Sequence, residues 1–210
     1  MRKKPEGWNV VLAGFWNRMI FTPEWVAPRL FEQDTQIETV VALLPVLPII
    51  YRDQEAAVEI SNARIVCRAR DLNNEAGLRR TAAIAQAILD ALPETPIQGL
   101  GLNFAFREPD PAGDLLELFN FDDSPRLAED GWEVGERKVI RRLTRDEEVL
   151  NLSLTLAADY LDLEFNFHTD PDDRDVLAAA LDSDRLIRLR DLAIQVSQDL
   201  YGLVLENDGE

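Results

Sequence analysis

The sequence contains one cysteine, one histidine and three lysines among its 210 residues. The lone cysteine, Cys67, excludes an internal disulfide framework and fits a reducing compartment, so we expect a cytoplasmic protein. The lone histidine, His168, excludes every site that needs two imidazoles, and a Ser-His-Asp arrangement would have to use that same side chain. We find no nucleophile elbow, P-loop or CxxC motif, and we expect no cofactor.

Long apolar runs are also missing from the sequence. The longest one, residues 40–50, contains Pro45 and Pro48 and reaches about half of the roughly 20 residues that a membrane-spanning helix needs. The basic start of the chain precedes an apolar run that Asn9, Gly14 and Asn17 interrupt, which is not the pattern of a signal peptide. We therefore expect no membrane segment.

Positive charge is scarce: 39 acidic residues face 22 basic ones, which gives a net charge of −17. Residues 1–106 hold 12 acidic and 11 basic side chains, whereas residues 107–210 hold 27 acidic and 11 basic, so almost all of the excess belongs to the second half. This balance argues against direct binding of nucleic-acid phosphates, which requires a basic face. The acidic half is either a solvated surface or a docking face for a protein partner with a basic surface.

Hydrophobic periodicity predicts an α+β fold, mainly antiparallel sheet, with two long amphipathic helices and a short N-terminal helix. Leucine and phenylalanine alternate with polar residues at 150–156 and 161–167, which is typical of a hairpin with one wet face. The short helix begins at Thr22, and the long ones end near Leu92 and Leu200. The expected strands are residues 9–16, 38–44, 57–60, 64–70, 97–106, 139–145, 150–156 and 161–167.

Composition divides the chain into a near-neutral α+β half at 1–106, an acidic linker region with proline and glycine at 107–131, and an acidic α+β half at 132–206. Residues 57–92 and 148–200 share one order of elements: strand, turn, strand, polar loop, long helix. This order predicts two similar halves. They would form either two domains or one domain with a shared sheet.

Two groups of side chains in the first half are candidates for binding. Trp16, Arg18, Phe21 and Trp25 belong to residue types that are enriched at interfaces, and their alternative role is the N-terminal core. Arg64, Arg68 and Arg70 form a basic stripe that could hold an anion or dock against the acidic half.

His168 lies beside the acidic loop Asp170–Asp175 and gives the only candidate metal site. Its weak candidate ligands are His168, Asp170, Asp172 and Asp173. The loop lacks the oxygen ligand, glycine and final glutamate that an EF-hand places at positions 5, 6 and 12, so capping of the following helix is the alternative.

The opening segment, NVVLAGFWNRMIFTPEWV at residues 9–26, resembles an uncharacterised bacterial family of sporadically distributed conserved proteins. The shared features are a strand, a Phe/Trp-Asn step and a Phe-x-Pro-x-Trp step. Sporadic distribution is typical of mobile and defence-linked genes, and the resemblance implies no mechanism.

These observations favour a non-enzymatic interaction or regulatory subunit of a bacterial multi-protein system, with homo-oligomerisation as an open alternative. The acidic half would then dock a basic partner. A second hypothesis is a nucleic-acid mimic or antitoxin-like inhibitor, whose carboxylates imitate phosphates. A third is a metal-assisted enzyme that uses His168 and the Asp170–Asp175 loop.

Overall fold

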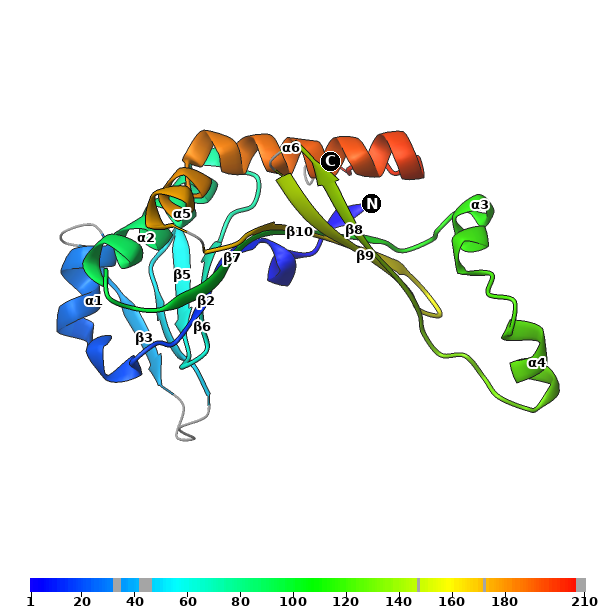
Figure 1. Ribbon diagram of the computed structural model, residues 1–210, viewed down its shortest axis with the longest axis horizontal. Helices are drawn as coiled ribbons and strands as arrows, with labels where there is room; N and C mark the ends of the chain where they lie inside the picture. Colours follow the sequence, from blue (N-terminus) through cyan, green and yellow to red (C-terminus); the bar gives the residue numbers. More distant parts are fainter. Residues whose placement is uncertain (32–34, 42–46, 147, 172, 207–210) are drawn as a thin grey trace.

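Strands from both halves of the chain form one antiparallel sheet in the computed structural model, which describes residues 1–31, 35–41, 47–146, 148–171 and 173–206. Within these ranges the sheet has ten strands in the order β3-β4-β5-β6-β2-β7-β10-β9-β8, and β1 pairs with β7 (Figure 1). The strands are β1 (Arg2–Lys3), β2 (Asn9–Gly14), β3 (Glu38–Val41), β4 (Ile49–Arg52), β5 (Ala56–Ile60), β6 (Arg64–Ala69), β7 (Ile97–Glu108), β8 (Arg137–Arg145), β9 (Glu148–Leu156) and β10 (Leu161–Thr169). The predicted α+β class with a large antiparallel sheet is confirmed.

Helices lie between the strands and after the last one. The α-helices are α1 (Pro23–Leu30), α2 (Glu75–Ala91), α3 (Gly113–Leu116), α4 (Ser124–Glu129), α5 (Arg174–Ala180) and α6 (Ser183–Tyr201), with short 3-10 helices η1 (Pro5–Gly7), η2 (Arg18–Ile20) and η3 (Glu117–Phe119). Among the described residues, no helix is both long enough and apolar enough to cross a membrane.

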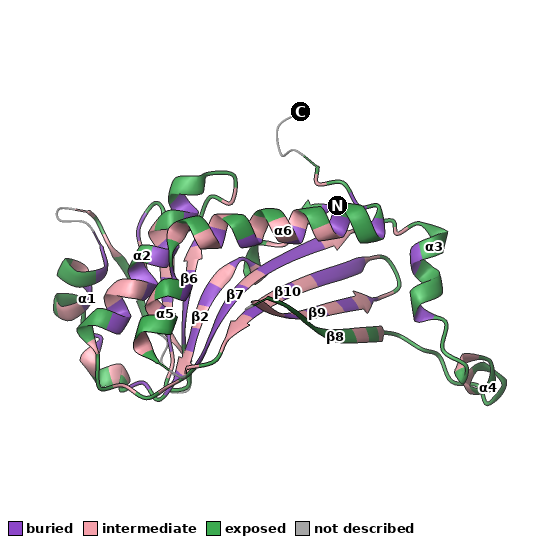
Figure 2. Ribbon diagram, turned by 45° about the horizontal axis from the view of Figure 1, so that its top comes forward, coloured by how far each residue is buried: buried purple, intermediate pink, exposed green. Residues whose placement is uncertain are grey.

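One face of the sheet carries the core. Leu100, Leu102, Phe104 and Phe106 alternate along β7 and are all buried, as the period of two residues predicts. Helices α2 and α6 lie along this face and are tied together by an ion pair between Arg190 and Glu75 (Figure 1). On the opposite face the described residues form no long helix, and most of its side chains are half-buried or exposed (Figure 2).

Capping residues define where the helices begin. The Thr22 side chain accepts a hydrogen bond from the backbone N–H of Trp25, so α1 begins where the sequence predicts. Asn74 and Asp182 cap α2 and α6 in the same way, and Gly202, with φ of 65°, ends α6 in the left-handed conformation that favours glycine.

The apolar run at 40–50 contains two described strands, although the sequence predicts only one. Strand β3 reaches Val41, and residues 42–44 of the expected strand lie outside the described residues. Strand β4, residues Ile49–Arg52, pairs antiparallel with β3 and was not predicted. A proline-interrupted run shows no alternation, so periodicity does not distinguish one strand from two.

The predicted order of elements is matched only in part: β5, β6 and α2 correspond to β9, β10 and α6, but α5 lies between β10 and α6 and has no counterpart between β6 and α2. The two halves are joined in the sheet by the nine-residue pairing of β7 with β10, from Leu161 opposite Glu108 to Thr169 opposite Leu100. The idea that one half arose by duplication of the other stays a prediction.

Candidate functional site

Four asparagines stand side by side across the open face of the sheet, one on each of four neighbouring strands. Asn151 on β9 donates through Nδ2 to Oδ1 of Asn166 on β10 (3.0 Å), which donates to Oδ1 of Asn103 on β7 (2.6 Å). Asn103 donates to Oδ1 of Asn9 on β2 (2.8 Å), and Asn9 donates to the backbone carbonyl of Glu6 (2.8 Å). Each of the four side-chain amides therefore donates in the same direction along the row, from β9 toward β2.

Two glycines on β7 leave space for the side chains of β10, because they have no Cβ atom. A Cβ atom at Gly101 would lie 2.7 Å from Nδ2 of Asn166, and one at Gly99 would lie 2.9 Å from Cε1 of His168. The side chains of β10 therefore lie over the backbone of β7. The glycines in the alternating segment at 97–106 are explained by close approach and not by a nucleotide-binding loop.

A hollow of about 460 Å³ lies over the asparagine row, and two of the predicted anion-binding arginines line it. Arg68 is paired with Glu59 at 2.9 Å, and its Nε atom is buried without a hydrogen-bond partner among the described residues. Arg64, four residues earlier on β6, is exposed. Arg70 lies beyond the end of β6 and donates to the backbone carbonyl of Asp53, so the structure does not bring all three arginines together.

An ion-pair cluster closes one end of the open face. Both oxygens of Asp162 on β10 accept hydrogen bonds from the guanidinium of Arg107 on β7, at 2.7 and 2.8 Å, and Lys4 donates to the same carboxylate at 2.7 Å. Burial raises the pKa of Asp162, but these hydrogen bonds outweigh burial and hold its pKa below the usual value. The cluster fastens the N-terminal segment to the centre of the sheet.

Replacing Asp162 by asparagine is expected to lower the free energy of unfolding at pH 7 by about 2 kcal/mol, the range of hydrogen bonds to charged groups. Because the pKa of the folded carboxyl is depressed, its contribution is complete above the unfolded pKa of about 3.9 and is lost as the pH falls through the folded value. Urea unfolding from pH 7 to pH 2 measures the difference. The difference in unfolding free energy between wild type and Asp162→Asn should become smaller at acid pH. A difference that stays constant with pH would refute this account.

The predicted aromatic interface group is mostly core. Trp16 and Phe21 are only 4% and 2% exposed, and their rings pack edge to face with centroids 6.3 Å apart. This burial supports the alternative role of these two side chains in the N-terminal core, and partner binding by the group stays a prediction. Trp25 is half-buried against Phe21 and lies under the guanidinium of Arg29, and Arg18 is half-buried in η2.

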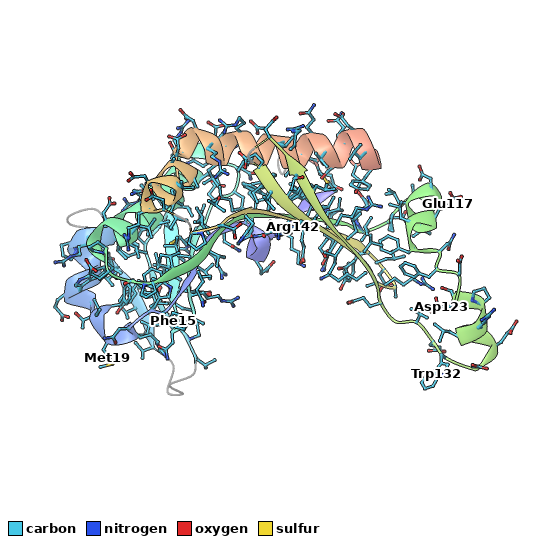
Figure 3. The ribbon with its side chains drawn as sticks, in the orientation of Figure 1. Phe15, Met19, Glu117, Asp123, Trp132 and Arg142 are labelled. Carbon is cyan, nitrogen blue, oxygen red and sulfur yellow. The ribbon has the colours of Figure 1, made fainter. Side chains whose placement is uncertain are left out.

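The exposed side chains of this segment are two residues that the sequence reasoning did not single out. Phe15 and Met19 are 66% and 83% exposed, and both border a shallow hollow beside Asn17 and Arg18 (Figure 3). They precede and follow the buried Trp16, so apolar character alone could not show which side chains face inward.

The segment between β7 and β8 forms an arm that projects from the sheet (Figures 1 and 2). We call residues 109–136 the acidic arm, because they hold nine acidic side chains and one basic one, Arg126, which gives a net charge of −8. Leu115 and Phe119 are buried and anchor its base, whereas no residue of α4 is buried. Half of the excess negative charge of residues 107–210 thus lies on this short segment.

Apolar side chains are exposed along the same arm. They are Leu116, Leu118, Phe121, Trp132 and Val134, and Trp132 is 68% exposed. Figure 3 shows Glu117, Asp123 and Trp132 spread along the arm, far from Phe15 and Met19 at the other end of the molecule. Within the described part of the chain, none of the nine arm carboxylates forms a salt bridge.

The candidate metal ligands are placed at the exposed end of β10. Nε2 of His168 lies 3.1 Å from Oδ1 of Asp170, and Asp173 caps α5 by accepting from the backbone N–H of Asp175. Asp172 lies outside the described residues. In the ranges that are described, no three His, Cys, Asp or Glu side chains are grouped so that they could hold a metal ion.

Cys67 has its expected place in a strand. It is fully buried in β6, and burial raises the pKa of its thiol to about 12. A thiol with so high a pKa carries almost no thiolate at neutral pH, so it is inert as a nucleophile.

No protein-family model matches the chain, and no curated protein is significantly similar to it. The functional argument therefore depends on this chain's own residues.

Proposed function

We propose that this protein is a non-enzymatic interaction subunit whose acidic arm docks onto a basic surface of a partner protein. The observation that carries the proposal is the combination, on one projecting segment, of a net charge of −8 with five exposed apolar side chains. A solvated surface needs the charge but not the exposed tryptophan, and interfaces are enriched in aromatic residues framed by polar ones.

Charge and apolar surface have different tasks in this arrangement. The carboxylates steer a basic partner toward the arm and exclude acidic ones. The apolar side chains, above all Trp132, then supply contact area that is removed from water. The regulatory role, the bacterial multi-protein setting and the cytoplasmic location belong to this proposal.

The test compares two variants that change the charge equally. The arm variant carries Glu117→Gln, Asp122→Asn, Asp123→Asn and Glu129→Gln, and the control variant carries Glu55→Gln, Glu94→Gln, Asp159→Asn and Asp199→Asn. All eight side chains are exposed, so neither variant disturbs the core.

Affinity capture from the native host should recover the same basic protein with wild type and with the control variant, and lose it with the arm variant. Capture that is lost equally with both variants would mean that total charge matters and the arm does not. Capture that survives in the arm variant would refute the proposal.

A further inference from the structure

The far edge of the sheet is a basic strand. Strand β8 carries Arg137, Lys138, Arg141, Arg142 and Arg145 and no acidic residue. It is the last strand in the sheet order and, among the described strands, pairs only with β9. One row of its backbone N–H and C=O groups is therefore unpaired within the described structure, as on any edge strand.

None of these five cations forms a salt bridge within the described residues. Arg141 donates to the hydroxyl of Tyr201 on α6, and Nε of Arg137 is buried and has no hydrogen-bond partner in the part of the chain that the structure describes. The residues that lead into β8 are acidic, since Glu133 and Glu136 belong to a stretch, residues 132–136, that forms neither helix nor ladder. An acidic segment thus leads directly into a basic strand, and no salt bridge joins the two within the described residues.

If β8 of one copy paired with β8 of a second copy, the charges on the two strands would favour some pairing registers over others. An antiparallel pairing centred on Arg141 would place it opposite its own copy and Arg137 opposite Arg145, and like charges directly opposite destabilise a sheet. A pairing centred on Val139 instead places Glu136 opposite Arg142 and Glu133 opposite Arg145. This shifted register gives four opposite-charge pairs and two Arg137–Arg141 pairs around a two-fold axis, whereas the register centred on Arg141 gives three arginine–arginine pairs and no opposite-charge pair.

We propose that a second copy of this chain docks on the β8 edge, with residues 133–145 of the two copies paired antiparallel about Val139. The arrangement is isologous and closed, so it yields a dimer and not a fibre. It covers the exposed side chain of Ile140 on each copy and supplies partners for the unpaired edge. It uses none of the four residues changed in the arm variant, and it would set two acidic arms near one axis, which raises the avidity for a partner with two sites.

Reciprocal charge reversal tests the register. One variant carries Glu133→Arg and Glu136→Arg, and the other carries Arg142→Glu and Arg145→Glu. All four side chains are exposed, and Arg137 and Arg141 are left unchanged because their guanidinium groups are partly buried or hydrogen-bonded. Sedimentation velocity of the full chain gives the mass of each species.

Wild type should sediment at twice the chain mass of 23.8 kDa, and each variant alone should be monomeric, with a dimer dissociation constant raised at least about tenfold. An equimolar mixture of the two variants should restore the dimer, as should one chain that carries all four changes, which also shows that the substitutions leave the fold intact. A monomeric wild type, dimeric single variants or a mixture that stays monomeric would each overturn the proposal. A monomeric wild type that still captures a basic partner through the arm would leave the proposed function standing.

Discussion

Replacing Trp8 by alanine is expected to lower the free energy of unfolding by about 3–5 kcal/mol, the range for removing a buried tryptophan. The indole is 1% exposed and contacts Phe104 and Phe106 edge to face, with ring centroids 5.3 and 5.5 Å away. Its Nε1 donates to the backbone carbonyl of Ala105 at 2.7 Å, so the variant also leaves a buried acceptor on β7 without that partner. The loss therefore combines a cavity with a broken hydrogen bond at the centre of the sheet.

Trp132→Ala is the matched control, because the same side chain is removed where it is mostly exposed. Its effect on the unfolding free energy should stay within about 0.5 kcal/mol. Urea denaturation followed by circular dichroism at 222 nm, a wavelength at which the helical backbone gives most of the signal, measures both variants. Equal losses for the two would contradict the distinction between a packed core at Trp8 and an exposed side chain at Trp132 that adds little to stability.

The arm variant is expected to bind its partner about a hundredfold more weakly than wild type, which corresponds to about 2.7 kcal/mol. Its four lost charges lie on a segment that has no internal salt bridges among the described residues, so they remain available to a partner. Raising the salt from 0.1 to 1 M shortens the Debye length from about 10 to about 3 Å. Wild-type affinity should fall steeply over this range, whereas the affinity of the arm variant, which keeps five of the nine arm carboxylates, should fall less steeply.

The unfolding free energy of the arm variant separates binding from folding. Because α4 has no buried residue, neutralising Asp122, Asp123 and Glu129 removes no packing. We expect urea midpoints for wild type, arm variant and control variant to coincide. If the arm variant both binds more weakly and unfolds at a lower urea concentration, its weaker binding would be explained by a damaged fold and not by the loss of an interface.

Much of the fold could be predicted from the sequence, because alternation and capping are local properties. The hairpin of β9 and β10 and the start of α1 at Thr22 follow from the residues themselves. Strand β4 could not be found in this way, since Ile49–Arg52 continues an apolar run that has no alternation. Burial of Trp16 beside exposed Phe15 likewise depends on packing such as that of the Trp16 ring against Phe21, and that is a tertiary property.

The asparagine row shows the same limit more clearly. The sequence places Asn103, Asn151 and Asn166 on the wet faces of their strands. It does not show that β7 pairs with β10. Among the described strands, this pairing alone joins the two halves of the chain, and it sets the amides side by side. A charge split of −1 and −16 between the halves also did not indicate that half of the excess lies on one arm.

Amide hydrogen exchange in the free chain and in the complex with its captured partner tests the docking role of the acidic arm most directly. The account predicts that partner binding slows exchange in residues 113–136, where α4 is unburied, and leaves α2 and α6 unchanged. Unchanged exchange throughout the arm, with protection appearing on the asparagine row or on the helical face, would contradict it.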